Sequence, residues 1–284
     1  MADRPENDGL SYCAAEVRRY DRDRFLTALF APPARREDLL ALYAFNHEIA
    51  KTRESVSETM VGHIRLQWWR EALDGIAAGE PRRHEVVEAL DRAVRNGLDV
   101  RALHALIDAR EFDLEDRAPA DVGELQNYVR STAGALNRLA ADLLGVTDAE
   151  TLAAAEEAGI AFATIGLIRA LPFHIRDRRR FLPDDIIDAE GVALDDLFEL
   201  RAEPEVRAAL ERLAGEGRQA IADSRRRKAR QRKAAMPVLL QASVAATHLK
   251  RLAAAGFDPR SRVFLSAPPL LPLTLWLRAT LRRH

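Results

Sequence analysis

A run of basic residues in the second half of the chain has the clearest potential for chemistry. Residues 176–180 read RDRRR, and Phe181-Leu182-Pro183 follow. Guanidinium groups bind phosphate and carboxylate oxygens through paired hydrogen bonds. The run therefore predicts a site for a phosphate or an acidic headgroup. The alternative is a solvated basic loop whose charge is balanced by Asp177, Asp184 and Asp185.

A second basic block, residues 224–233 (SRRRKARQRK), carries seven basic side chains. Such a block is typical of nucleic-acid binding or of an anionic membrane surface. No aromatic residue is interleaved, so the block lacks a platform on which bases could stack. The formal net charge of −1 also gives no global attraction to nucleic acid. We therefore expect no nucleic-acid partner, and either a membrane contact or a solvated helix face.

Two other patterns carry weaker signals. Gln67-Trp68-Trp69-Arg70 suits a wall of a central cavity, with Arg70 placed to recognise an anion. The alternative is that Trp69 belongs to the core and Arg70 pairs with a neighbouring acid, as aromatic stripes at helical spacing usually do. Asp113 and Asp116 are spaced like metal ligands, but acidic runs near a helix end are usually solvated.

Composition sets the class of fold. The 284 residues are 48% hydrophobic, alanine, leucine, arginine and glutamate dominate, and β-branched residues are sparse. This favours helix throughout and allows one large helical domain or two small ones. The single cysteine, Cys13, excludes an internal disulfide and suits a small packing residue. Because no secretory signal and no stretch of about 20 apolar residues is found, we expect a cytoplasmic location.

The helices that must position these residues follow from apolar spacing and breaker residues. The stretch 39–70 organises the chain, and Gly159, Ala163, Gly166 and Ala170 give a later helix a face of small residues. Asp121, and Thr147 or Asp148, are expected N-caps, and Pro172 is expected to disturb its helix. The predicted helices span residues 10–30, 35–55, 61–78, 84–96, 100–112, 121–144, 147–171, 205–224, 236–255 and 273–284. Residues 1–9 are predicted to be flexible, 10–258 to form the helical domain, and 259–284 to form an apolar and basic tail, packed on the domain or lying at a membrane surface.

Three motifs resemble the signatures of the squalene/phytoene synthase family. Ala44-Phe45-Asn46-His47 opens the first, but its aspartate positions hold Ala50, Lys51 and Glu54. The second keeps Arg169, whereas its asparagine becomes Gly166 and its aspartates become Ala170 and His174. The third is residues 128–134 (YVRSTAG), with Ser131 at the family's second tyrosine.

The resemblance implies an all-α fold, a single-domain isoprenoid-synthase-type helical bundle around a central cavity. It also implies lost chemistry, because family enzymes hold Mg²⁺ on these aspartates and Mg²⁺ stabilises the departing diphosphate. Of the five aspartate positions only Glu54 offers a carboxylate, so we expect neither Mg²⁺ nor a catalytic residue. By position in the family fold, the candidates for lining the cavity or binding an anion are Tyr43, His47, Arg70, Tyr128, Arg169, Arg176 and Arg179.

One branch of the family is especially similar. Three short sequence motifs of that branch are matched by residues 44–50 (AFNHEIA), 56–58 (VSE) and 65–69 (RLQWW). That branch contains mitochondrial complex I assembly factors with a squalene/phytoene synthase-like domain. The resemblance implies a catalytically degenerate protein that assists assembly of respiratory complex I and contacts a complex subunit or assembly intermediate. It would work in the cytoplasm or peripherally on the inner face of the inner membrane, with an isoprenoid or lipid as a further candidate ligand.

Two alternatives remain open. The protein could be an active prenyltransferase, acting on farnesyl or geranylgeranyl diphosphate in isoprenoid biosynthesis with rebuilt ligands. His47, Glu54 and His174 would then hold Zn²⁺, Fe²⁺ or Mn²⁺, if the helices pack as in the family. It could also be a lipid or isoprenoid binder without catalysis.

Overall fold

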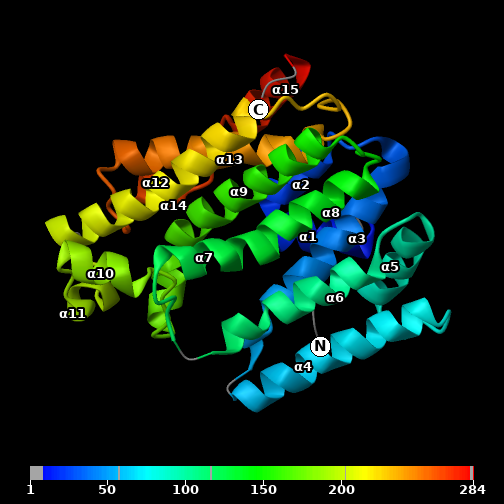
Figure 1. Cartoon of the computed structure of the whole chain (residues 1–284), viewed down its shortest axis with the longest axis horizontal. Coiled ribbons are helices and arrows are strands. Elements are labelled where there is room, and N and C mark those ends of the chain that lie inside the picture. The colour runs from blue at the N-terminus through cyan, green and yellow to red at the C-terminus, as the bar shows by residue number, and fades with distance from the viewer. Residues whose placement is uncertain (1–8, 57, 116, 202, 282–283) are drawn as a thin grey trace. The chain divides into compact units, whose positions relative to one another are not determined.

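The computed structural model describes residues 9–56, 58–115, 117–201, 203–281 and 284. These residues form helices and connecting loops, with no strand among them. The chain divides into two compact units (Figure 1): unit 1 is Met1–Glu115 with Leu139–Val146, and unit 2 is Asp116–Arg138 with Thr147–His284. Residues 1–8, Ser57, Asp116 and Arg282-Arg283, on which parts of the sequence predictions fall, lie outside the described residues.

Unit 1 is built around α3, which packs against α1 and α5, while α4 packs against α5 and α6. Its centre is filled by Tyr43 and Phe45 of α3 and by Trp69 of α4, each no more than 2% exposed. Phe45 and Trp69 meet edge to face at 5.4 Å, a favoured aromatic geometry. The helices are α1 (Tyr12–Tyr20), α2 (Arg22–Ala28), α3 (Pro33–Ala50), α4 (Thr59–Ala77), α5 (Glu85–Arg95) and α6 (Val100–Ala109), with 3₁₀ turns at Arg53–Ser55 and Glu111–Leu114.

The prediction of one first helix over residues 10–30 was wrong. Asp21 leaves the helical conformation, with φ −136° and ψ 65°, and separates α1 from α2. Its carboxylate accepts a hydrogen bond from the Arg24 backbone N–H at 3.1 Å and from Arg24 Nη1 at 2.6 Å. Asp21 therefore acts as the N-cap of a second helix, a function that an aspartate inside an apolar pattern does not reveal.

Unit 2 is built around α9, which lies along α12 and α13 in Figure 1 and packs against both. Apolar residues fill this packing, among them Ile165 and Ile168 of α9 and Leu239 of α13. α8 (Ala135–Leu143) crosses the boundary between the units at residue 139. The other helices are α7 (Val122–Val129), α9 (Ala149–Arg176), α10 (Asp184–Glu190), α11 (Leu194–Phe198), α12 (Pro204–Arg226), α13 (Met236–Ala254), α14 (Arg262–Leu265) and α15 (Leu271–Thr280).

α9 runs through Pro172 to Arg176, which corrects the expectation that the proline would disturb the helix near residue 171. A proline inside a helix costs about 3 kcal/mol. Leu171 and Ile175, on either side of it, are 3% and 5% exposed, so burial holds the last turn in place. By length and composition α9 is also long and apolar enough to cross a membrane. Half of the relevant window is buried inside the protein.

The predicted helix 121–144 is continuous but contains a π-helical turn, Arg130–Gly134. Asp121 is its N-cap, as expected, and accepts from the Glu124 N–H at 2.8 Å. The turn coincides with the third family motif, and Gly159 of α9 lies against it. A Cβ on Gly159 would be only 2.3 Å from the carbonyl oxygen of Ala133. The small-residue face of α9 therefore allows a close backbone approach at Gly159, whereas Gly166 has open space around it.

Candidate functional site

The first degenerate aspartate motif lies at the end of α3 in unit 1. Ala50 is the last residue of the helix and Lys51 its C-cap, while Glu54 lies exposed in the following 3₁₀ turn. Lys51 Nζ donates to Glu48 Oε1, and Arg65 Nη2 of α4 lies 3.0 Å from Glu48 Oε2. Glu48, which precedes these positions, is only 7% exposed, and its carboxylate is enclosed by two cations of its own unit.

These residues do not fit Mg²⁺. The ion takes oxygen ligands in octahedral geometry, whereas Ala50 offers a methyl group, Lys51 an ammonium, and Glu54 a single exposed carboxylate. Across the described parts of the chain, no group of three or more His, Cys, Asp or Glu side chains is placed to hold a metal ion. The prediction that no Mg²⁺ is used stays a prediction, and metal analysis remains the test of rebuilt ligands.

Two other unit 1 candidates, Tyr43 and His47, are held by aromatic contacts. His47 stacks on Tyr20 with ring centroids 4.6 Å apart. Burial, followed by the charge of Lys51, lowers the pKa of His47 and favours the neutral ring. Tyr43 is 2% exposed, and the guanidinium of Arg24 lies 5.7 Å from its ring centroid. Tyr43 is therefore part of the core of unit 1.

Arg70 pairs with acids of its own unit. Its Nη2 lies 2.7 Å from Asp108 Oδ1 and 2.6 Å from Glu111 Oε1, while Trp69 beside it is 2% exposed. This is the second of the two interpretations made from the sequence. In the same region Arg110 Nη1 contacts Asp113 Oδ2 at 3.3 Å, so this acid of the 111–116 run is held by an ion pair.

Cys13 lines a small pocket of unit 1, between α1, α3 and α5. Its volume of about 50 Å³ has room for a water molecule or two but not for an isoprenoid chain. Burial raises the pKa of the Cys13 thiol to about 12, and the side chain is 3% exposed. Since the thiolate is the reactive form, Cys13 is a packing residue, as its single occurrence indicated.

In unit 2, the ring of Phe181 contacts three residues that the sequence analysis named. Tyr128 stacks on its ring at 5.5 Å, His174 tilts against it at 4.9 Å, and the Arg179 guanidinium lies 5.5 Å from its centroid. Burial, and then the charge of Arg179, lowers the pKa of His174 to about 4. We call these four side chains the Phe181 cluster. It was missed from the sequence because Phe181 itself carries no chemistry.

The basic loop that looked most like an anion site is mostly used inside unit 2. Arg180 donates to the Leu182 carbonyl at 3.0 Å and pairs with Asp184. Arg178 lies over the ring of Phe198, at 6.0 Å. Arg176 is exposed at the end of α9. Much of the predicted phosphate-binding charge is thus engaged in packing and pairing.

Arg169, the residue kept from the second motif, meets a buried histidine. Its Nη1 lies 2.6 Å from Nε2 of His248, which is 3% exposed on α13. A guanidinium only donates, so Nε2 accepts. Ala170 next to it is half-buried and brings no ligand atom. At the third motif, exposed Ser131 donates to the Tyr128 carbonyl at 3.1 Å and stays within its own helix.

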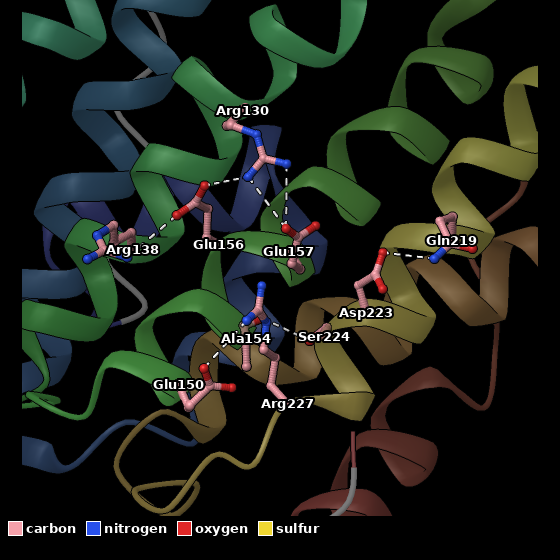
Figure 2. Close-up of polar contacts among 10 residues, drawn as sticks. All are labelled: Arg130, Arg138, Glu150, Ala154, Glu156, Glu157, Gln219, Asp223, Ser224 and Arg227. Atoms are coloured by element: carbon pink, nitrogen blue, oxygen red, sulfur yellow. Dashed lines mark hydrogen bonds and ion pairs between the residues drawn. The ribbon is translucent and has the colours of Figure 1, made fainter. Parts of the chain in front are cut away.

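An ion-pair network ties the π-turn to α9 (Figure 2). Arg130 points toward two acids, with Nη1 2.6 Å from Glu156 Oε1 and 3.4 Å from Glu157 Oε1. Arg138 adds a contact to Glu156 at 3.5 Å. Burial raises the pKa of Glu157, and the guanidinium of Arg130 opposes that rise. The network has a structural role, because each acid faces a basic partner from the neighbouring segment.

Comparison with known proteins shows the family to which the sequence of this chain is similar. A family model described as squalene/phytoene synthase matches residues 17–268. A relative from Bos taurus, "NADH dehydrogenase (ubiquinone) complex I, assembly factor 6", is 32% identical over 274 residues. That match covers 96% of this chain and 82% of the relative.

Two solved structures have the same fold. A dehydrosqualene synthase in complex with a ligand superposes with a TM-score of 0.81 at 16% identity, over 95% of this chain and 94% of the other. A squalene synthase from Alicyclobacillus acidocaldarius gives 0.76 at 20% identity, over 87% and 94%. At these identities the likeness establishes the all-α isoprenoid-synthase-type fold, and the chemistry must come from the residues.

Proposed function

This chain belongs to the squalene/phytoene synthase family, and we propose that it assists the assembly of respiratory complex I instead of transferring prenyl groups. One observation carries the proposal. Lys51 stands at one of the positions that resemble the family's first aspartates, and it pairs with the buried Glu48, which also pairs with Arg65. An ammonium in place of a carboxylate offers Mg²⁺ no oxygen ligand through which to hold a diphosphate, and this supports a role without that chemistry. The similarity to a complex I assembly factor along 96% of the chain supports the role that replaces this chemistry.

The partner and the location belong to the same proposal. The protein would contact a subunit or an assembly intermediate of the complex, at the inner face of the membrane that carries it. We also propose that the fold retains space for an isoprenoid or another lipid as a structural ligand. Support comes from the dehydrosqualene synthase on which this chain superposes, since that structure is a complex with a ligand.

The direct test is NADH:quinone oxidoreductase activity in membranes from a strain that lacks the gene. We expect a selective loss of this activity, while a respiratory enzyme outside complex I is unchanged. Re-expression of the wild-type chain should restore the activity, and so should Glu54→Ala. This variant removes the last carboxylate at the five aspartate positions, so its success would show that metal chemistry is not needed.

Two outcomes would redirect the proposal. Normal NADH:quinone oxidoreductase activity in the deletion strain would remove the assembly role. Rescue by wild type but not by Glu54→Ala or His174→Ala, together with metal bound stoichiometrically to the purified protein, would favour a prenyltransferase with rebuilt ligands. Both variants should first be shown to accumulate to wild-type levels, because His174 lies in the Phe181 cluster.

A further inference from the structure

The helix α15 is apolar on two faces, and only one of them packs against the protein. Leu271 and Leu275 are buried, at 1% and 0% exposure, where α15 packs on α13 in unit 2. The outward side carries five large apolar residues that are 46–67% exposed. They are Leu270, Leu273, Trp276, Leu277 and Leu281.

The outward residues form a continuous stripe. At about 100° per residue, the four leucines fall within about 80° of arc, and Trp276 lies next to them. Monomeric proteins rarely expose contiguous apolar patches larger than roughly a few hundred Å², and larger patches mark interaction sites. Arg278 is the one charged residue from 263 to 281, and it is half-buried. At about 100° per residue it lies beside the stripe, next to Leu281, so the stripe itself carries no charge.

Arginines gather where α15 meets the end of α12. Arg225 Nε donates to the main-chain oxygen of His284 at 2.7 Å, and the His284 ring contacts the Ser224 carbonyl at 3.4 Å. Burial, and then the charge of Arg278, lowers the pKa of Arg225. Arg232, Arg225 and Arg278 also act on buried His284. Arg225 and Arg278 therefore bring two like charges close together beside α15.

Another exposed apolar group serves as a contrast. Met60, Val61 and Ile64 on α4 of unit 1 are 66%, 45% and 62% exposed. The nearby Arg65 is already paired with Glu48. Exposed apolar side chains alone therefore do not mark the α15 surface, whereas their junction with Arg225 and Arg278 does.

We propose that the outward face of α15, with Arg225 and Arg278 at its edge, docks this protein onto an anionic membrane surface. The leucines and Trp276 would enter the boundary between headgroups and acyl chains, as amphipathic helices lying in a membrane plane do. The arginines would bind lipid phosphates. This inference takes from the proposed function only its membrane location, and it names a surface other than the Arg176–Arg180 loop.

The test is co-sedimentation of the purified chain with vesicles made of equal parts phosphatidylcholine and phosphatidylglycerol. We expect binding to these vesicles, and much weaker binding to phosphatidylcholine alone or at high salt. Trp276→Ser/Leu277→Ser should lower the affinity about tenfold or more, since both side chains would otherwise leave water. Arg225→Gln/Arg278→Gln should abolish the preference for the anionic lipid. Met60→Ser/Ile64→Ser is the matched control and should bind like wild type.

A second readout reports insertion directly. Acyl chains carrying bromine should quench fluorescence of the wild-type protein, and this quenching should be largely lost in Trp276→Phe. Equal binding by wild type and Trp276→Ser/Leu277→Ser would overturn the proposal, as would equal binding to neutral vesicles. A dimer in solution that the same double variant dissociates would assign the face to a second copy of the chain instead. Because these assays contain no complex I, they can fail while the assembly role stands, and the reverse also holds.

Discussion

At the scale of single residues, the positions that resemble the family's aspartate motifs lie among packing and ion-pairing side chains. Lys51 pairs with Glu48 three residues earlier, and Arg65 from the next helix pairs with the same carboxylate. His174 occupies a family aspartate position and is packed against Phe181. A carboxylate at position 174 would be largely buried and would face an aromatic ring. Both surroundings disfavour the ionised form of a carboxyl group. The substitutions thus fit their local surroundings as packing and ion-pairing residues.

Two histidines with lowered pKa values, His174 and His284, predict how the free energy of unfolding depends on pH. Burial and arginine charges lower the pKa values of His174 and His284 to about 4, whereas an unfolded histidine titrates near 6.5. Between these values the unfolded chain binds more protons than the folded one, so the free energy of unfolding should decrease as pH falls from about 6.5 to 4. Above that window these two groups contribute no pH dependence. Urea unfolding at pH 7.5 and pH 5.0 measures the difference.

A variant isolates the contribution of His174. His174→Gln cannot titrate, so we expect it to lose about 1–2 kcal/mol less than wild type between the two pH values, a value discounted because the ring is partly exposed. His63→Gln, at an exposed position of α4, is the control and should follow wild type. An identical pH dependence in His174→Gln and wild type would show that the neutral His174 ring does not couple to folding.

At the scale of helices, the contact between α9 and the π-turn is the most demanding feature of unit 2. The turn places the Ala133 carbonyl where a side chain at position 159 would have to be. π-helical turns are rare and often accompany functional positions, and this one lies in a family motif. The backbone approach therefore fixes how the third motif packs on α9.

Glycine substitutions on one helix test this contact. In Gly159→Ala the new Cβ would lie 2.3 Å from Ala133 O and 3.0 Å from the Cβ of Asn137. Because backbone cannot move aside easily, we expect a loss of about 3 kcal/mol or more in the free energy of unfolding. Gly166→Ala has open space in the same helix and should gain about 0.5–1 kcal/mol. Similar stabilities for the two variants in urea unfolding would mean that the close approach does not exist in solution.

The same helices show what sequence can and cannot predict here. Strong apolar spacing predicted α4, α12 and α13 within two residues at each end, and Asp121 and Asp148 are caps as expected. The break at Asp21 was missed because an aspartate inside an apolar pattern does not reveal that it caps a second helix. The continuation through Pro172 was missed because burial of Leu171 and Ile175 overrides local preference. The candidate site was harder still. Pairings such as Glu48 with Arg65, or Phe181 with Tyr128, join residues from different segments, and no spacing rule reveals them.

At the scale of the whole molecule, the family match from residue 17 to 268 takes in segments of both compact units. The helices of the family fold are thus present. Of the five positions that resemble the family's aspartates, only Glu54 carries a carboxylate. A fold is retained through many compatible apolar residues, whereas a metal site is lost with a few substitutions. What the remaining fold binds is then the question that distinguishes a lipid-binding assembly factor from an enzyme.

The thermal unfolding temperature, measured with farnesyl diphosphate in buffers that contain either Mg²⁺ or EDTA, tests what the fold binds. A ligand that binds only the folded state raises stability by RT ln(1 + [L]/Kd), about 2.7 kcal/mol at a hundredfold excess over Kd. If the fold holds isoprenoids through apolar contacts, we expect an increase in Tm that is the same in both buffers, and farnesol should act similarly. An increase that requires Mg²⁺ or another divalent metal would mean that the diphosphate is bound through metal, as in an enzyme with rebuilt ligands. No increase with either compound would remove the isoprenoid and leave protein and membrane contacts as the basis of function.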